Sequence, residues 1–138
     1  MTFKPERLLF TLLFSVMSTS FALAQQSPEQ VVQTQLDTYN NRDIDGFMAT
    51  MSQDVELFSF GDPKPSASGY SAVKNLYTSL FEKSPKLHST LTNRIVLGNK
   101  VLDHESITGR MGNAEVLELV VIYEVKDEKI FKVTVLRK

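Results

Sequence analysis

Cysteine is absent from this chain of 138 residues, and histidine occurs only twice. Without cysteine the protein forms no disulfide bond and has no thiol nucleophile. His88 and His104 stand alone, without the His-x-His, His-x₃-His or HExxH spacing that is typical of metal sites. The sequence therefore predicts no metal and no cofactor, and structural or surface roles are favoured for both histidines over acid, base or ligand roles.

A strong charge of either sign is also lacking. The chain has 15 basic and 16 acidic residues, which gives a formal charge of −1. Removal of residues 1–24 takes away Lys4, Arg7 and Glu6 and changes the formal charge to −2. Nucleic acids and anionic membranes require a basic surface. We therefore expect no nucleic-acid partner, and no membrane partner once the first segment is removed.

The sequence motifs of two large enzyme classes are missing. The chain contains neither the GxSxG motif of serine hydrolases nor the GxxxxGK[ST] phosphate loop. The stretch GDPKPSASG, residues 61–69, has serines beside glycines but matches neither motif. Its composition is typical of an irregular loop.

Only the N-terminus carries a long apolar run. Lys4 and Arg7 precede LLFTLLFSVMSTSFALA, residues 8–24, which ends in small residues. This layout is typical of a secretory signal peptide and predicts cleavage between Ala24 and Gln25, with a periplasmic or secreted product. An N-terminal membrane anchor is the alternative, although the run is short for a bilayer and is interrupted by serine and threonine. Residues 25–138 then have the size of one small domain.

Three amphipathic helices are predicted after this segment. Ser27, Pro28 and Gln30 fit the N-cap, first-turn and capping-box positions of a helix that ends near residues 40–41. Asp43 can cap a second, shorter helix with an apolar stripe at helical spacing, and a third helix over 70–81 stops before Ser84-Pro85. The stripe of the second helix consists of Ile44, Phe47, Met48 and Met51.

Strands are predicted in the remaining sequence. Residues 55–60 alternate in polarity, residues 87–97 and 100–108 flank Gly98-Asn99, and residues 115–125 and 129–137 flank Asp127-Glu128. Helices followed by consecutive antiparallel strands indicate an α+β fold with the helices on one face of a sheet.

These segments resemble one family of proteins. The stretch VVQTQLDTYNNRDIDGFMATMSQDVEL, followed by GYSAVKNLYTSLF, LTNRIVLGNKVLDHE and VIYEVKDEKIFKV, resembles the nuclear transport factor 2-like (NTF2-like) superfamily, which includes SnoaL-like proteins and ketosteroid isomerases. The resemblance covers nearly all of residues 28–138. It implies a cone-shaped fold in which three N-terminal helices pack on a strongly curved antiparallel β-sheet, and it implies a homodimer. Function does not follow, because this fold hosts enzymes, binding proteins and assembly modules.

Ketosteroid isomerase chemistry needs a carboxylate base and two acidic hydrogen-bond donors, a tyrosine and a protonated aspartate. The resemblance assigns the tyrosine position to Gln35, the base to a position near Ser59, and the second donor to a position near Val121. None of the three carries the required group, so we expect a different activity. The nearest acids along the chain are Asp62, Glu118 and Glu124.

Five polar residues cluster in the hairpin around Gly98-Asn99. With those two residues as the loop, Arg94 faces Asp103, Thr92 faces Glu105, and Asn93 faces His104. Opposed residues share a face, so the cluster divides into an Arg94 side and a His104 side. We predict that the Arg94 side faces the interior. The alternative is that the carboxylates face solvent or pair with basic neighbours such as Arg94 or Lys100.

Aromatic side chains provide a candidate ligand pocket. Most of them lie on the predicted buried stripes, where core packing explains them. In the family that the chain resembles, however, the core opens into a pocket between the helices and the concave sheet face. The resemblance thus implies an apolar site with phenol hydroxyls as polar groups. The predicted pocket residues are Phe58, Phe60, Tyr77, Tyr123 and Arg94.

The leading interpretation is an exported SnoaL-like domain protein that binds a small, largely apolar or amphipathic molecule in the cone. One alternative is an acid–base enzyme of the isomerase, cyclase or dehydratase type, with Asp103 or Glu105 as the base and Arg94 or Tyr123 as the electrophilic partner. Another is an assembly module that pairs through the sheet. Asp103 and Glu105 inside the cone near Tyr123 would favour the enzyme, whereas a fully packed cone would favour the assembly module.

Overall fold

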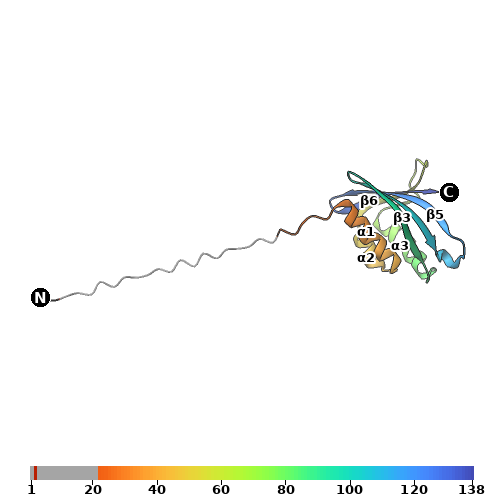
Figure 1. Ribbon diagram of the computed structural model, residues 1–138, viewed down its shortest axis with the longest axis horizontal. Coiled ribbons are helices and arrows are strands. Elements are labelled where there is room, and N and C mark those ends of the chain that lie inside the picture. Colours follow the sequence, from red (N-terminus) through yellow and green to blue (C-terminus); the bar gives the residue numbers. More distant parts are fainter. Residues whose placement is uncertain (1, 3–21) are drawn as a thin grey trace.

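The computed structural model describes Thr2 and residues 22–138, so the predicted signal peptide lies almost wholly outside the described residues. Three helices gather on one face of a curved six-stranded sheet (Figure 1). This arrangement confirms the predicted α+β fold. No helix in residues 22–138 is long and apolar enough to cross a membrane. The elements are α1 (Pro28–Asn40), α2 (Ile44–Ala49), β1 (Met51–Ser59), β2 (Ala67–Ser68), α3 (Tyr70–Glu82), β3 (His88–Leu97), β4 (Lys100–Thr108), β5 (Leu117–Lys126) and β6 (Lys129–Arg137).

The strands lie in the order β2-β1-β6-β5-β4-β3. Neighbouring strands are antiparallel except β1 and β6, which run parallel. The two-residue strand β2 lies inside the stretch that was predicted as an irregular loop. Strand β1 begins four residues earlier than predicted, at Met51, because α2 ends at Ala49 and Thr50 caps it.

Local sequence signals place the element ends. Ser27 accepts a hydrogen bond from the Gln30 backbone amide, and the Gln30 side chain bonds back to the Ser27 amide, so the predicted capping box is present. Asp43 likewise caps α2. Asp127 and Glu128 adopt φ values of 50° and 60°, as expected for a two-residue turn that joins twisted strands.

The hairpin of β3 and β4 contains a β-bulge that the sequence did not reveal. Arg94 pairs with Asp103 and Asn93 with His104, as predicted, but Glu105 pairs with Leu91 rather than with Thr92. The predicted Thr92–Glu105 pair is wrong because the bulge inserts one extra residue into β3 between Leu91 and Asn93. Beyond the bulge every side chain of β3 changes face relative to a regular ladder.

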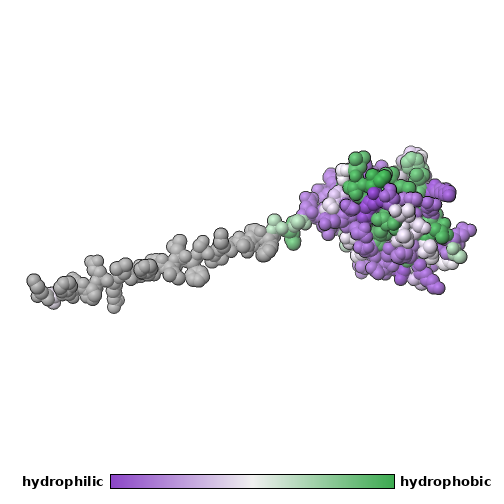
Figure 2. Space-filling view, viewed as in Figure 1, coloured by the Kyte–Doolittle hydropathy of each residue, from purple (hydrophilic) through white to green (hydrophobic). Residues whose placement is uncertain are grey.

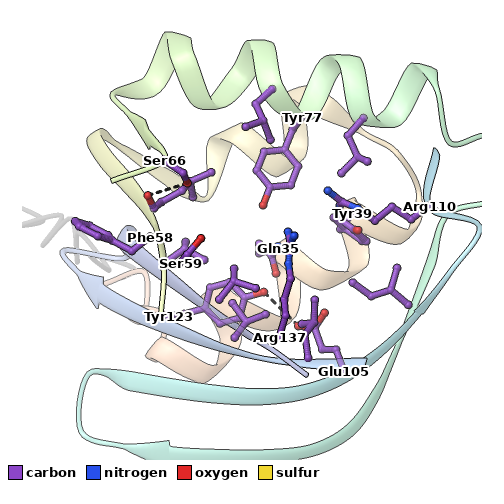
Figure 3. A pocket seen from close by; sticks show the side chains of 18 of the residues that line it. Gln35, Tyr39, Phe58, Ser59, Ser66, Tyr77, Glu105, Arg110, Tyr123 and Arg137 are labelled. Atoms are coloured by element: carbon purple, nitrogen blue, oxygen red, sulfur yellow. Dashed lines mark hydrogen bonds between the residues drawn. The ribbon is translucent and has the colours of Figure 1, made fainter. Parts of the chain in front are cut away.

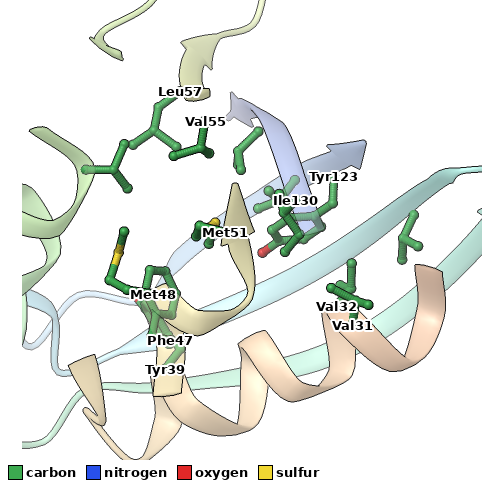
Figure 4. Close-up of a cluster of buried hydrophobic side chains, with 14 of the residues drawn as sticks. Val31, Val32, Tyr39, Phe47, Met48, Met51, Val55, Leu57, Tyr123 and Ile130 are labelled. Carbon is green, nitrogen blue, oxygen red and sulfur yellow. The ribbon is translucent and has the colours of Figure 1, made fainter. Parts of the chain in front are cut away.

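One apolar core lies between the helices and the inner face of the sheet (Figure 4). Four rings from all three helices pack against one another, with centroids 4.4–6.4 Å apart in tilted and edge-to-face pairs. These rings belong to Tyr39, Phe47, Tyr77 and Phe81. Apolar side chains also lie on the surface near the β3–β4 turn, where Ile95, Val96 and Leu97 are exposed (Figure 2).

Candidate ligand site

A cavity of about 150 Å³ lies between α1, α3 and the concave face of the sheet (Figure 3). The cone is therefore not fully packed. About half of the lining residues are aliphatic and come from inward-facing strand positions and from the helices, including Leu57, Leu80, Ile107, Leu119, Val121 and Val133. The polar side chains that interrupt this wall come from six different elements, from the loop before β2 and from the turn after β4.

Glu105 is the carboxylate in the lining of this cavity. Its side chain is almost completely buried, because β4 turns alternate residues toward the helices. Ser89 donates a hydrogen bond of 2.7 Å to Oε2, and the Tyr123 hydroxyl donates one of 3.2 Å to Oε1. Burial raises the pKa of Glu105 above its ordinary value, and the nearby charge of Asp103 adds to the increase. The hydrogen bonds from Ser89 and Tyr123 and the positive charge of Arg94 lower the pKa of Glu105 and so oppose this increase.

Three tyrosines line the cavity: Tyr39, Tyr77 and Tyr123. Burial raises the pKa of Tyr77 to about 12, and it also raises the pKa of Tyr39 and of Tyr123 well above the ordinary value of a tyrosine. The nearby Glu105 carboxyl also raises the pKa of Tyr77 and Tyr123. All three phenols are therefore neutral hydrogen-bonding groups at ordinary pH.

Gln35 of α1 faces the same space (Figure 3). It is 4% exposed, and its Oε1 atom is buried without a hydrogen-bond partner among the described residues. A buried acceptor that forms no hydrogen bond costs about 1–3 kcal/mol, so native structures rarely retain one without a reason.

Two arginines complete the polar lining, Arg110 after β4 and Arg137 at the end of β6 (Figure 3). Gly109 allows the chain to turn sharply before Arg110, because it has φ of +71° and its α-carbon packs on the Lys86 backbone. A β-carbon at this position would overlap the Lys86 carbonyl oxygen. Only glycine therefore fits the turn that brings Arg110 to the cavity.

The predicted interior face is confirmed, but its four candidate residues separate into two groups. Glu105 and Tyr123 meet in the cavity. Asp103 is completely buried and forms a bidentate ion pair with Arg94, with two N–O distances of 2.7 Å. Arg94 also donates a hydrogen bond of 2.9 Å to Gln33 of α1. The Arg94–Asp103 pair thus connects the hairpin to α1 and lies outside the cavity lining.

The predicted pocket set needs two corrections. Phe58, Tyr77 and Tyr123 line the cavity, with Lys132 Nζ 4.8 Å from the centroid of the Phe58 ring. Phe60 does not line the cavity, because β1 ends at Ser59 and Phe60 is 61% exposed. Arg94 does not line the cavity either, because hydrogen bonds to Asp103 and Gln33 hold its guanidinium between the hairpin and α1.

The isomerase positions that the resemblance assigned do lie at this site. Gln35, Ser59 and Val121 all line the cavity, yet none has a carboxyl or phenol group. The neighbouring acids do not replace them. Asp62 is exposed in the loop after β1, Glu118 contacts His104 at 2.8 Å on the outer face, and Glu124 pairs with Lys100 and Lys132.

Arg110 and Arg137 were missed by the sequence analysis. Strand alternation could have predicted that Arg137 faces inward. It lies two residues after Val135 and four residues after Val133, and both valines face inward. Arg110 lies in an irregular turn where no periodicity applies. His88 is exposed at the start of β3. No group of three or more potential metal ligands occurs among the described residues.

A family model for the SnoaL-like domain matches residues 32–133. The chain belongs to the SnoaL-like family. This confirms the resemblance found in the sequence, and the cavity of this SnoaL-like protein lies inside the matched region apart from Val135 and Arg137. Among curated proteins, none matches the chain.

Three solved structures show the same fold. A cystatin-fold protein from Novosphingobium aromaticivorans is 19% identical, with a TM-score of 0.74 over 81% of this chain and 99% of that one. An NTF2-like protein from Cytophaga hutchinsonii is 12% identical, with a TM-score of 0.68 over 83% and 93%. A proposed ketosteroid isomerase from Kribbella flavida is 20% identical, with a TM-score of 0.68 over 80% and 77%. These similarities establish the cone-shaped NTF2-like architecture.

Proposed function

We propose that this SnoaL-like protein binds a small, largely apolar molecule in the cavity. The observation that carries the proposal is the buried Gln35 Oε1 atom, which has no hydrogen-bond partner among the described residues. A hydroxyl or amide N–H on a bound molecule would satisfy this acceptor, while the aliphatic wall would cover the rest of the ligand.

The volume of the cavity limits the size of that molecule. An engineered cavity of about 150 Å³ in another protein holds one benzene molecule, whereas pockets for drug-sized ligands measure roughly 300–1,000 Å³. A cavity of about 150 Å³ therefore suits a ligand with one six-membered ring or a chain of similar bulk. A steroid would require a larger space.

Phenol and toluene test this proposal, because they have nearly the same shape but phenol carries a hydroxyl donor where toluene carries a methyl group. Phenol should bind about tenfold more tightly than toluene in calorimetric or NMR titrations, because only phenol can donate to Gln35 Oε1. Gln35→Leu should remove this preference. The control Gln53→Leu changes an exposed glutamine in β1 and should preserve it. Failure of both compounds to bind, or an unchanged preference in Gln35→Leu, would contradict the proposal.

A second candidate function is acid–base catalysis by Glu105. It is favoured because Glu105 faces the cavity beside Tyr123, and burial raises its pKa. Such a carboxylate is a stronger base than one in water. Glu105, which accepts a hydrogen bond from Tyr123, would remove a proton from a carbon atom of the ligand, and the neutral phenol of Tyr77 would donate a hydrogen bond to the oxygen that gains charge.

Hydrogen–deuterium exchange at the α-carbon of cyclohexanone in D₂O, followed by NMR, measures this ability on a compound with one six-membered ring. The carboxylate removes the α-proton, the enolate oxygen gains the charge, and a deuteron from D₂O then returns to the carbon. The rate should increase with pH as Glu105 loses its proton, and Glu105→Gln should reduce it at least tenfold. Glu115→Gln, at an exposed position, is the matched control. A rate that is equal in Glu105→Gln and the parent would exclude Glu105 as the base.

Export also belongs to this proposal. The support is the charged start, apolar run and small residues of 1–24. Full-length protein expressed in a Gram-negative host should yield a periplasmic product whose first residue is Gln25. Mass spectrometry of the intact protein distinguishes this product from the uncleaved chain, which would contradict export by cleavage.

A further inference from the structure

Arg110 and Arg137 reach the cavity from places far apart in the sequence. Arg110 follows β4 and Arg137 ends β6, and both side chains point toward the centre of the cavity (Figure 3). The positive charges of both lower the pKa of the same group, the Tyr77 hydroxyl, against the effect of its burial. The two guanidinium groups therefore converge on one small volume beside Tyr77.

Neither of these guanidinium groups has a carboxylate partner among the residues that the structure describes. The two other described arginines are bound: Arg94 pairs with Asp103, and Arg42 donates to the carbonyl oxygens of Leu87 and Asn40. No ion pair links Arg110 or Arg137 to any carboxylate in residues 22–138. A guanidinium remains charged at all ordinary pH values, so two like charges face the same cavity.

The Glu105 carboxyl group in the cavity lining does not neutralise the positive charges of Arg110 and Arg137. Glu105 accepts one hydrogen bond on each oxygen atom, from Ser89 and Tyr123, and forms no ion pair with either arginine among the described residues. Its burial also favours the neutral form. The cavity is thus electropositive, although the whole chain has a formal charge of −1.

We propose that the ligand is a compact organic anion whose carboxylate lies between Arg110 and Arg137 and whose apolar body fills the aliphatic part of the cavity. This inference rests on the proposed binding function and specifies the chemical class of the ligand. A guanidinium matches a carboxylate with two parallel hydrogen bonds, and two guanidiniums in a partly enclosed site hold it strongly. The cavity volume restricts the body to about one ring.

Benzoate and benzamide provide the test, because they have the same shape but differ in charge. At pH 7 benzoate should bind the full-length protein at least tenfold more tightly than benzamide. Arg110→Gln and Arg137→Gln should each reduce benzoate affinity about tenfold and should reduce benzamide and phenol affinity by a clearly smaller factor, because only benzoate carries a charge. Arg137→Lys, which retains the charge, should recover part of the loss. Lys126→Gln removes an exposed positive charge elsewhere and should have little effect.

The outcomes separate the two proposals. If benzamide binds as tightly as benzoate, or if the arginine variants weaken both compounds equally, the anion site is wrong and the binding function stands. If phenol, benzamide and benzoate all fail to bind, the binding function is wrong as well. The affinity of each variant for phenol also reports whether its cavity has folded normally.

Discussion

At the scale of single residues, the inner face of β4 places two carboxyl groups in different roles. Asp103 accepts two hydrogen bonds of 2.7 Å from the Arg94 guanidinium. This pair joins the hairpin to α1, because Arg94 also donates to Gln33. Glu105, two residues later on the same face, receives only hydroxyl donors. The first carboxylate is therefore compensated and structural, and the second remains available for chemistry in the cavity.

The raised pKa of Glu105 predicts a dependence of stability on pH. The folded protein binds this proton more tightly than the unfolded chain, so the free energy of unfolding should decrease as pH rises from the ordinary value near 4.5 through the folded-state pKa. Glu105→Gln should remove this part of the decrease. Urea denaturation of the parent and the variant across this pH range measures it, and equal pH dependence in both would be evidence against the shift.

The Arg94–Asp103 pair predicts a large and partner-dependent effect on stability. Arg94→Ala leaves the buried Asp103 charge unpaired and should reduce the free energy of unfolding by about 3–5 kcal/mol in urea denaturation. The double variant Arg94→Met with Asp103→Leu should regain most of that loss, because no unpaired charge remains. Lys74→Ala removes an exposed pair with Asp45 and should change stability little. A small loss in Arg94→Ala would contradict a structural role for the pair.

At the scale of elements, the bulge in β3 and the turn after β4 shape the site. In a regular ladder Thr92 would face Glu105, and Thr90 would take the inner position near it. The bulge brings Ser89 to the inner face instead, where it is 2% exposed and donates to Glu105. The turn after β4 directs Arg110 into the cavity. Both features depend on how distant segments pack, which explains why local pattern did not predict them.

Gly109 gives a prediction for the turn after β4. Gly109→Ala adds a β-carbon at positive φ that also overlaps the Lys86 backbone. Gly98→Ala, in the β3–β4 turn, imposes a similar φ of +59° with open space around it. Gly98→Ala should lower the free energy of unfolding by about 1–2 kcal/mol, and Gly109→Ala by about 1–3 kcal/mol more. Thermal or urea denaturation compares them, and equal losses would show that the overlap is relieved without cost.

At the scale of the whole molecule, the outer face of the sheet is the surface on which we predict that two copies pair. Val120 and Leu136 are opposed there in β5 and β6, and Leu136 is 41% exposed. Light scattering after size exclusion should show a dimer at micromolar concentration, and Leu136→Glu should yield a monomer. Val116→Glu, at a more exposed position before β5, is the control. A parent protein that is monomeric would refute the prediction.

Much of this molecule was determined by the sequence alone. Capping residues and apolar spacing located α1, α2 and α3, and two-residue turns located both hairpins, because these features depend on neighbours within a few residues. The same local geometry correctly paired Arg94 with Asp103. Only the tertiary structure decided that Phe60 lies outside the site, that the bulge brings Ser89 to Glu105, and that Arg110 and Arg137 converge with Gln35 around one cavity. These outcomes require contacts between segments far apart in the chain, and local periodicity carries no information about such contacts.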